Sequence, residues 1–550
     1  MTNKMAGEIG VIVLFSCCLA IAICNVQQQY REKGRSVAVT QTSGMPWPMP
    51  KQMTVTTIQR ILDVGSFQFL VSSSTQRCDI IDEAFVRYRK YIFGNDDRTL
   101  KFKTNRKPRH GSIDQEAYLD TLQINIASGC DGYPSEESNE AYTLMISQDA
   151  STATINANEV WGALRGLETF SQLVYQNDMG LAVINATIIN DAPRFQHRGL
   201  LLDTSRHFLS LDILKENLEL MAQNKFNVFH WHIVDDQSFP YESYYFPDMS
   251  RKGAYSVRHV YTHSDVKEII EFARVRGIRV IPEYDSPGHS QSWGLAITNL
   301  LTKCYKDGQL SGDFGPIDPS VNSTFQFLQN FFLEISQVFP DKFIHLGGDE
   351  VPFDCWESNP DITSFMTMMG YGKNYALLEE YYMQRLIDIV QGLNKGYMIW
   401  QEVIDNGAKV APDTIVHIWK GGYQDELTKV TKLGYNAVLS APWYLNYISY
   451  GSDWRNYYQV EPLNFNGTDA QKALVIGGET CMWGEYVDNT NLIPRMWPRA
   501  ASVGERLWSP MEVNSADAAT SRLEEHRCRL LKRGFPVQPV NGPGFCSVEL

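Results

Sequence analysis

Two adjacent carboxylic acids, Asp349 and Glu350, follow an apolar run and a pair of glycines within residues Phe343–Val351. This pattern is typical of a buried strand that stops at a tight turn and presents acids at its end. Neighbouring carboxylates in unequal environments can have different pKa values, so that one is ionised and the other protonated. Such a pair can perform acid–base chemistry, although acids in this position also cap helices. On this stretch alone the two interpretations are evenly balanced.

Other polar and aromatic side chains occupy the same position, directly after a short apolar run. A pocket with tryptophan walls, several acids and few lysines suits a neutral polyhydroxylated ligand. The residues in this position include Arg206, Asp235, His289, Trp400, Trp419, Tyr444, Asn446, Trp483 and Glu485.

The elements that must position these residues are eight apolar runs that alternate with segments of helical periodicity from residue 195 onward. Eight strands alternating with helices over this length predict a (β/α)8 barrel, in which the C-terminal ends of the strands share one rim. The predicted strands are Gly199–Asp203, Asn227–Val234, Ile278–Glu283, Phe343–Leu346, Tyr397–Trp400, Thr414–Trp419, Ala437–Ala441 and Leu474–Gly478. The predicted helices include Leu211–Asn224 after the cap residue Ser210, Val266–Arg276 before Gly277, and Asp517–Arg533 before Gly534.

The chain before the barrel divides into three parts. Residues 1–26 contain an apolar run typical of a secretory signal peptide, with an uncleaved membrane anchor as the alternative. Residues 27–45 are polar and predict a flexible linker. Residues 46–194 predict a small α+β domain with helices at Asp82–Tyr91 and Val160–Tyr175, the second with an amphipathic face. The barrel domain is then residues 195–550.

Cysteines and charge agree with an exported protein. The formal charge of −14 argues against nucleic acid and anionic membrane surfaces as partners. Neighbours in sequence suggest three disulfides, with Cys481 reduced, although spacing alone does not fix the connectivity. The suggested pairs are Cys78–Cys130, Cys304–Cys355 and Cys528–Cys546, and glycosylation sequons occur at Asn185, Asn322 and Asn466.

Three function classes compete for the predicted rim. His230 and His232 are two residues apart, so on a strand they face the same way, and with His289 and an aspartate they could hold a metal. Glycoside hydrolysis instead uses a protonated carboxylic acid that donates to the leaving oxygen. A non-catalytic sugar-binding barrel is the third class, and the intact acid pair argues against it. We expect no metal and no cofactor.

Four motifs resemble the β-N-acetylhexosaminidases of glycoside hydrolase family 20, and in particular the animal lysosomal α/β subunit type. They are His345-Leu346-Gly347-Gly348-Asp349-Glu350, Asp203-Thr204-Ser205-Arg206-His207, Trp231-His232-Ile233-Val234-Asp235-Asp236 and Trp483-Gly484-Glu485. The resemblance extends from about Trp47 to Cys546. It implies a small domain followed by a (β/α)8 barrel and a retaining exo-enzyme without a protein nucleophile, in which the substrate's acetamido oxygen forms an oxazolinium intermediate.

The resemblance also implies the residue roles. Glu350 is the general acid and base, Asp349 orients the acetamido group, and Tyr444 holds its oxygen. Substrate-binding roles fall to Arg206, Asp235, His289, Trp400, Trp419, Asn446, Trp483 and Glu485. Tryptophan walls and the charge of Asp349 are expected to keep Glu350 protonated, whereas Asp349 must stay ionised.

The pair Asn446-Tyr447 departs from the family pattern. The α type has Asn-Arg at this place and the β type has Asp-Leu, so Asn446 is α-like whereas Tyr447 lacks the α-type cation. We therefore predict a preference for neutral terminal GlcNAc and GalNAc. The resemblance further implies β-linked N-acetylhexosamine glycans as substrates, a homodimer, and a lysosomal location with secretion as the alternative. Membrane contact is expected only if the leader is uncleaved.

Overall fold

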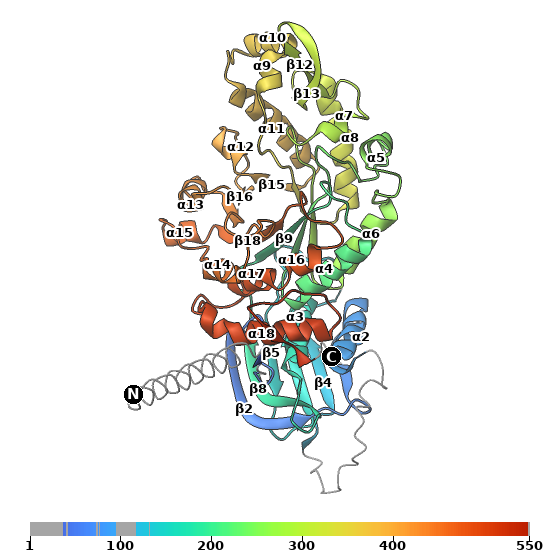
Figure 1. The fold of residues 1–550 in the computed structure, drawn as a ribbon, viewed down its shortest axis with the longest axis vertical. Helices are drawn as coiled ribbons and strands as arrows, with labels where there is room; N and C mark the ends of the chain where they lie inside the picture. Colours follow the sequence, from blue (N-terminus) through green and yellow to red (C-terminus); the bar gives the residue numbers. More distant parts are fainter. Residues whose placement is uncertain are drawn as a thin grey trace, which may run out of the picture.

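The computed structural model describes residues 37–39, 42–72, 75, 77–94, 117–130 and 132–547, which form a small sheet domain and a barrel stacked on each other (Figure 1). The predicted leader, residues 1–26, and the first part of the predicted linker lie outside the described residues. Within the described ranges, no helix has the length and apolar character needed to cross a membrane.

The small domain is a seven-stranded sheet in the order β2-β8-β5-β6-β4-β3, with β7 paired to β8. Alternating buried side chains along β4 show that one face of this sheet forms the domain core. Helices α2 and α3 belong to the same core. The elements are β2 (Gln52–Ile61), β3 (Gln68–Val71), α2 (Asp79–Phe93), β4 (Thr121–Ile126), β5 (Tyr142–Ile146), β6 (Thr152–Ala157), α3 (Val160–Leu173), β7 (Tyr175–Gln176) and β8 (Ala182–Asp191).

Helix α3 turns its predicted apolar face to the domain core, and it is nevertheless buried on all sides. The reason is that the barrel covers the face that would otherwise meet water. From that face Arg165 donates to the backbone oxygens of Phe226 and Gly277 in the barrel. Glu140 accepts from Arg165 at 2.8 Å and from Arg198 at 2.6 Å, and all three side chains are buried. Because the removal of one partner from a buried ion pair costs about 3–5 kcal/mol, this cluster fixes the small domain to the barrel.

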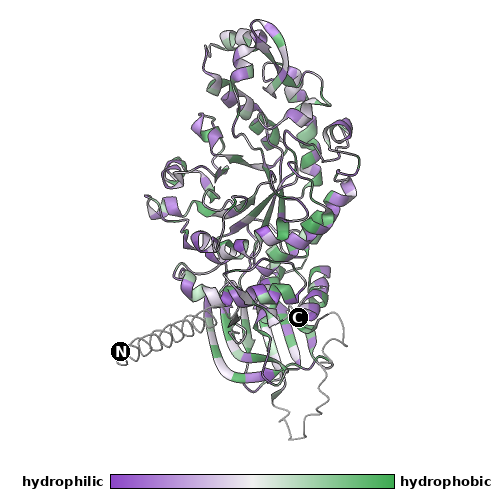
Figure 2. Ribbon diagram, in the orientation of Figure 1, coloured by the Kyte–Doolittle hydropathy of each residue, from purple (hydrophilic) through white to green (hydrophobic). Residues whose placement is uncertain are grey.

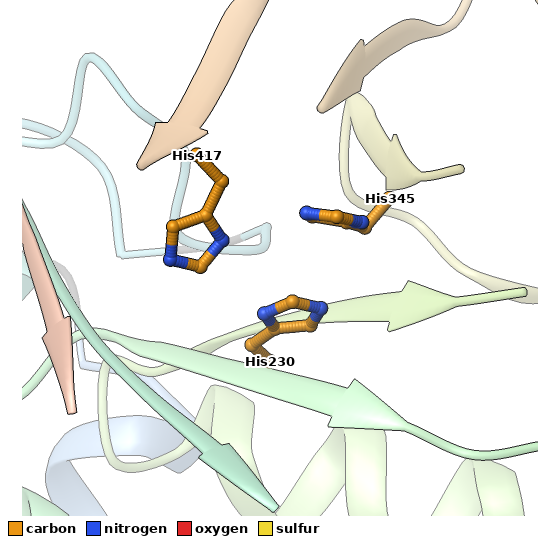
Figure 3. A group of neighbouring side chains, drawn as sticks. All are labelled: His230, His345 and His417. Carbon is orange, nitrogen blue, oxygen red and sulfur yellow. The ribbon is translucent and has the colours of Figure 1, made fainter. Parts of the chain in front are cut away.

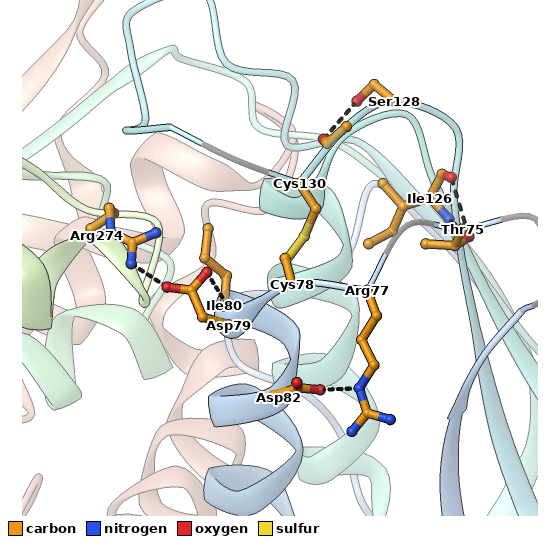
Figure 4. Close-up of a disulfide and its surroundings, with 11 residues drawn as sticks. Thr75, Arg77, Cys78, Asp79, Ile80, Asp82, Ile126, Ser128, Cys130 and Arg274 are labelled. Carbon is orange, nitrogen blue, oxygen red and sulfur yellow. Dashed lines mark hydrogen bonds and ion pairs between the residues drawn. A yellow bond between two sulfur atoms is a disulfide. The ribbon is translucent and has the colours of Figure 1, made fainter.

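A disulfide and an ion pair hold the start of α2 (Figure 4). Cys78 is bonded to Cys130, and Asp79 pairs with Arg274 of the barrel helix α6 (His263–Arg274). The other two disulfides, Cys304–Cys355 and Cys528–Cys546, also join the cysteines predicted to pair, and Cys481 is buried and free.

The barrel is closed and parallel, with the strand order β9-β10-β11-β14-β15-β16-β17-β18 returning to β9. This confirms the predicted (β/α)8 architecture. The prediction was wrong about the end of the last strand, which continues to Met482 because its backbone pairs with β9 through Met482 and Leu202. The strands are β9 (His197–Asp203), β10 (Val228–His232), β11 (Arg279–Glu283), β14 (Phe343–His345), β15 (Gly396–Trp400), β16 (Ile415–Ile418), β17 (Asn436–Leu439) and β18 (Val475–Met482).

Helices surround the barrel, and side chains cap several of them. Ser210 caps α4 as predicted, and Thr262 forms a capping box with Asp265 at the start of α6, three residues earlier than expected. The remaining helices are α5 (Asp248–Gly253), α7 (Gln291–Gly294), α8 (Asn322–Val338), α9 (Asp354–Ser358), α10 (Pro360–Met369), α11 (Tyr375–Gly392), α12 (Glu402–Asp405), α13 (Tyr423–Lys432), α14 (Trp454–Gln459), α15 (Asp469–Lys472), α16 (Leu492–Met496), α17 (Arg499–Trp508) and α18 (Ala516–Lys532), with α4 at Leu211–Gln223. Strands β12 (Leu301–Lys306) and β13 (Gln309–Ile317) form a hairpin outside the barrel.

Part of the predicted linker is structured. Strand β1 (Val37–Ala38) pairs with β19 (Gly544–Phe545) near the other end of the chain. The backbone N–H of Thr42 donates to Glu525 of α18 at 2.6 Å. These contacts order residues that a polar composition alone assigns to a flexible linker.

The barrel interior is layered along the strands, whose ribbons are strongly hydrophobic in Figure 2. Because side chains alternate along a strand, inward-facing residues recur every second position. At the N-terminal end lies an apolar layer made of Val228, Ile281, Phe343, Met398, Ile415 and Val438. Two residues further along the strands comes a layer with buried histidines and glutamates, and the third layer is the rim.

Candidate active site

The acid pair lies on a turn that glycine makes possible. After β14, Gly347 and Gly348 have φ values of 67° and 96°, in the left-handed region that favours glycine. The N–H of Gly348 donates to Asp285 Oδ1 at 2.8 Å, and a Cβ on Gly347 would lie 1.7 Å from that oxygen. The turn therefore follows tightly around Asp285. The next helix, α9, has its N-cap at Phe353, so the capping interpretation of the acids was wrong.

The turn directs the two acids to different environments. The side chain of Asp349 is 11% exposed, whereas that of Glu350 is 58% exposed. Glu350 has a φ of 49°, which is unusual for a non-glycine residue and turns its side chain away from the buried one. His289 lies between them, with Nε2 3.9 Å from Asp349 Oδ2 and 3.7 Å from Glu350 Oε2.

His289 is held by Asp235, which also binds Arg206. The Nδ1 of His289 lies 3.1 Å from Asp235 Oδ1, and Arg206 Nη2 lies 2.8 Å from Asp235 Oδ2. Arg206 is fixed a second time by Asp203, whose Oδ2 is 3.0 Å from Nη1. The structure thus brings together Arg206, Asp235 and His289 beside the acid pair, although they come from three separate strand ends.

The pKa values of the two acids differ in the opposite sense from the prediction. Burial raises the pKa of Asp349 to about 6. The imidazole of His289 lowers the pKa of Glu350, because Glu350 is open to water and faces a cation. The expectation that Glu350 is protonated and Asp349 ionised was therefore wrong for this arrangement of side chains. Sequence reasoning expected burial of Glu350, whereas Asp349 is the buried member of the pair.

Four aromatic side chains form a box beside Asp349. The ring of Tyr444 lies 6.3 Å from that of Trp419 and 6.4 Å from that of Trp483, and Trp400 lies 6.1 Å from Trp483. The N–H of Trp400 donates to Glu283 at 2.8 Å, and that of Trp419 donates to Glu402 at 2.9 Å. Both indoles are therefore fixed in orientation by buried carboxylates.

Asn446 and Glu485 lie at the outer edge of this box. The carbonyl oxygen of Asn446 accepts from Arg495, and its side-chain Oδ1 is buried with no hydrogen-bond partner among the described residues. Glu485 is exposed and raises the pKa of Arg206 together with the nearer Asp203 and Asp235, although burial acts against this shift. All eleven predicted catalytic and substrate-binding residues thus lie at the C-terminal rim of the barrel or in the loops that follow it.

Sequence reasoning assigned no role to four acids that support the site. Asp203 fixes Arg206 and accepts from the N–H of Gly484, while Glu283 and Glu402 hold the indoles of Trp400 and Trp419. Asp285 braces the glycine turn; burial and the neighbouring Asp349 raise its pKa well above the usual range. Each acid ends or follows a predicted strand. Its position at the rim could therefore be predicted from the sequence, whereas its interaction partner could not.

The metal hypothesis placed His230, His232 and His289 together. In the structure, a carboxylate lies between each histidine and the next. His232 and His289 contact opposite oxygens of Asp235, while His230 lies one layer deeper, 2.6 Å from Glu479. Two other sets at the rim, Asp235–Asp236–His289 and Asp285–His289–Asp349, do bring ligand atoms within 4.8 Å of one another. Arg206 and His289 already supply positive charge to these carboxylates, which disfavours a bound cation.

Comparisons with known proteins match both domains. Residues 195–511 match the family model described as "Glycosyl hydrolase family 20, catalytic domain", and residues 46–173 match "beta-acetyl hexosaminidase like". The chain is 51% identical to a beta-hexosaminidase subunit beta of Homo sapiens over 95% of this chain and 93% of that protein. It is also 51% identical to a subunit alpha of Bos taurus, over 98% and 99%. The solved structure of a Flavobacterium johnsoniae chitobiase matches with a TM-score of 0.77 at 30% identity, over 90% of this chain and 74% of that chain.

The raised pKa of Asp349 predicts a pH-dependent stabilisation by Asp349→Asn. Between the ordinary pKa of an aspartic acid and about 6, the folded state binds the proton more tightly than the unfolded state, so stability falls as pH rises through this window. The Asn variant lacks this cost. It should be more stable than the wild type at pH 7, by at most roughly 2–3 kcal/mol, and no longer so below about pH 4.

Chemical unfolding at pH 4 and pH 7 measures this difference. Glu350→Gln is the matched control, because the pKa of Glu350 is lowered and its charge is solvated. That variant should gain no stability at pH 7. A destabilised Asp349→Asn protein at pH 7 would contradict the assignment.

Proposed function

Because the chain belongs to glycosyl hydrolase family 20, we propose that Asp349 and Glu350 are the catalytic pair of its exo-β-N-acetylhexosaminidase activity. The protein hydrolyses β-linked N-acetylhexosamine glycans at the non-reducing end. Retention of configuration with help from the substrate is characteristic of the family. The acetamido oxygen attacks the anomeric carbon as the leaving oxygen departs, and water then opens the oxazolinium intermediate.

One observation carries the assignment of Asp349. Its Oδ1 is buried beside the aromatic box and has no hydrogen-bond partner among the described residues. A buried acceptor without a donor costs free energy, and the acetamido N–H of a bound sugar supplies that donor. In this proposal Asp349 orients the acetamido group and, once ionised, stabilises the positive charge that develops on it. Trp400, Trp419 and Trp483 enclose its methyl group, and the Tyr444 hydroxyl donates to its oxygen.

Glu350 is the proposed general acid, and later the base that activates water. It is the more exposed member of the pair and therefore accessible to the leaving oxygen and to water. The lowered pKa of Glu350 fits the second role directly. For the first role the bound saccharide must cover Glu350, since removing water from a carboxyl group raises its pKa. His289, supported by Asp235, positions Glu350.

The remaining rim residues bind the sugar hydroxyls in this proposal. Arg206 is fixed by two aspartates and stands over the ring of Trp483 at 5.2 Å, so its guanidinium is rigid and directed. Glu485 lies beside it as an acceptor. The unpartnered Oδ1 of Asn446 accepts from an outer hydroxyl. A site of this composition recognises a neutral sugar.

Glu350→Gln tests the proton-donor role. On aryl β-N-acetylglucosaminides at acidic pH, kcat should fall by about 10²–10⁴ for a poor leaving group such as a simple phenol. The loss should be much smaller for dinitrophenyl, which departs without protonation. Asp349→Asn is the matched control, because it acts on the acetamido group and should slow both substrates alike.

Two further measurements separate this function from its alternatives. The wild-type enzyme should cleave GlcNAc and GalNAc glycosides but not the plain glucoside, and a thiazoline mimic of the oxazoline should inhibit it. Dialysis against EDTA should leave activity unchanged. Full activity of Glu350→Gln on the phenyl substrate would refute the proton-donor assignment, and binding without turnover would favour a sugar-binding protein.

Tyr447 is proposed to restrict the enzyme to neutral substrates. Its side chain is 65% exposed and its ring lies 5.8 Å from that of Tyr444, so it faces the outer part of the site without offering a charge. The wild-type enzyme should therefore prefer neutral GlcNAc to 6-sulfated GlcNAc. Tyr447→Arg should raise kcat/KM on the sulfated substrate about tenfold, the effect of one charge-assisted hydrogen bond. Tyr447→Gln is the uncharged control, and equal turnover of both sugars by the wild type would be incompatible with this proposal.

A homodimer is proposed from an aromatic surface next to the site. Tyr447, Ile448, Tyr450 and Tyr486 are exposed, and Arg495 joins their two loops by donating to the carbonyl oxygens of Asn446 and Tyr486. The relatives named as subunits support assembly. Sedimentation should give a dimer for the wild type and a monomer for Ile448→Ser/Tyr450→Ser. The exposed Val257→Ser serves as control; a monomeric wild type would exclude the dimer.

The remaining proposals concern the domains and processing. We place the domain boundary at 194/195, between the end of β8 and the start of β9, and assign residues 1–26 to a leader. Asn322 and Asn466 are exposed and suit glycosylation, whereas Asn185 is half-buried and accepts from Tyr175. The animal relatives are consistent with an enzyme of the secretory pathway, and within it we propose the lysosome, with secretion as the alternative.

A further inference from the structure

We propose that His230 and Glu479, buried in the barrel one layer below the rim, are positioning residues that set the protonation of the His289–Glu350 pair. They do so through a row of alternating imidazoles and carboxylates that extends through the barrel, joined by short contacts of which the one between His230 Nε2 and Glu283 is an ion-pair distance without hydrogen-bond geometry. The inference rests on the proposed function, since Glu350 is taken as the proton donor, and it assigns a role to residues that touch no substrate.

The deep half of the row joins four strands. Glu479 Oε2 lies 3.2 Å from His197 Nε2, and its Oε1 lies 2.6 Å from His230 Nδ1. The other nitrogen of His230, Nε2, is at an ion-pair distance of 3.0 Å from Glu283 Oε2. His197 also borders a cavity of about 310 Å³ at the N-terminal end of the barrel. The row therefore spans the layer between that cavity and the rim.

The upper half leads to the catalytic acid. Glu283 Oε2 lies 2.6 Å from His232 Nδ1, and His232 Nε2 lies 2.7 Å from Asp235 Oδ2. The opposite oxygen of Asp235 contacts His289 at 3.1 Å, and His289 Nε2 faces Glu350 at 3.7 Å. Within this half, His232 has one carboxylate at each nitrogen, and His289 has Asp235 at Nδ1 and both Glu350 and Asp349 near Nε2.

The row carries alternating charges. Although burial opposes it, Glu479 and Glu283 raise the pKa of His230 to about 9, and Glu283 and Asp235 raise that of His232 well above its usual value. Despite burial, the histidines lower the pKa values of Glu479 and Glu283. The raised pKa values favour the cationic form of His230 and His232, each of which lies between two carboxylates of the row, and Asp235 at the upper end is paired with Arg206 as well.

Neutral side chains surround His230, the deepest cation of this row (Figure 3). His345 and His417 lie beside His230, with ring centroids 4.5 and 5.8 Å from it. Burial lowers the pKa of both. Burial also lowers the pKa of His197 and raises that of the Cys481 thiol, so the charged groups that face His230 are Glu479 and Glu283 alone among the described residues.

Nitrogen atoms of His230, His345 and His417 lie within 4.8 Å of one another, which is a possible metal group. His230 cannot serve as a ligand without losing a proton that two carboxylates retain. We therefore interpret His345 and His417 as neutral neighbours of a protonated His230, and not as ligands of a metal.

Glu283 links the row to both parts of the proposed chemistry. Its Oε2 faces His230 and His232, while its Oε1 accepts the N–H of Trp400 in the aromatic box. A change of charge at Glu479 or His230 therefore alters the potential felt by His232, Asp235 and finally His289. The sign of that change depends on which charge is removed.

Glu479→Gln and His230→Gln provide the test because they remove opposite charges at similar volume. The readout is kcat against pH for an aryl β-N-acetylglucosaminide, whose basic limb reports deprotonation of the acid in the enzyme–substrate complex. Loss of the Glu479 anion should move this limb to lower pH, and loss of the His230 cation should move it to higher pH, each by roughly half to one unit. The double variant should return toward the wild-type limb.

Ser440→Ala is the matched control, since Ser440 is buried in the barrel and uncharged. Ser440→Ala should not shift the basic limb. Glu479→Asp keeps the negative charge, so its basic limb should lie at the wild-type pH. Shifts in the same direction for both Gln variants, or reduced kcat without any shift, would overturn the proposal and indicate a packing role. The wild-type substrate preference tests the proposed function separately, because it does not depend on these variants.

A measurement on the wild-type enzyme keeps the proposal testable if the Gln variants do not fold. Histidine-labelled full-length protein should show imidazoles that are protonated at both nitrogens at pH 7 and that lose a proton only near pH 9. Absence of any such imidazole at pH 7 would contradict the charge pattern of the row.

Discussion

The structure depends on the groups that offset the free-energy cost of burying carboxylates in the barrel. An isolated buried carboxylate is very costly, so each must meet a cation, hydrogen-bond donors or a proton. Glu283 and Glu479 meet imidazoles, Asp235 meets Arg206 and two histidines, and burial raises the pKa of Asp285 well above its usual value, which favours a bound proton. Asp349 has one buried oxygen without a hydrogen-bond partner among the described residues. The uncompensated acceptor lies where the substrate is proposed to bind.

The same compensation explains what the sequence allowed and what it did not. The apolar runs were enough to predict all eight strands. A barrel strand is buried along its length and therefore forms a short apolar run, whichever strand pairs with it. The rim residues were readable for the same reason, since each follows its run directly. Pairing across strands was not readable: nothing local connects His230 with Glu479, which are 249 positions apart. The spacing of His230 and His232 suggested a metal site, because the sequence shows that the two histidines face the same way. It does not show that glutamates from distant parts of the chain lie beside them.

The reversed pKa order of the acid pair has a conformational origin. Sequence alone assigns both acids to one strand end and does not show which of the two is buried. In the fold, two glycines and the left-handed conformation of Glu350 direct the side chains apart, so that Asp349 is buried and Glu350 stays exposed to water. Helix α3 is a related case, since the barrel covers its polar face, a contact that its own sequence does not show. In both cases burial is decided by a distant part of the chain.

These observations indicate where the fold carries strain in favour of the site. Glu350 and His289 have φ values of 49° and 50°, and a non-glycine residue in such a conformation costs of order 1–3 kcal/mol. Both lie in the same cluster as the unpartnered Asp349 oxygen. The layer below shows no such strain at its charged residues and compensates every charge of the row. A rigid and fully paired layer beneath a strained rim is the arrangement expected if the lower layer fixes the geometry that the upper one uses.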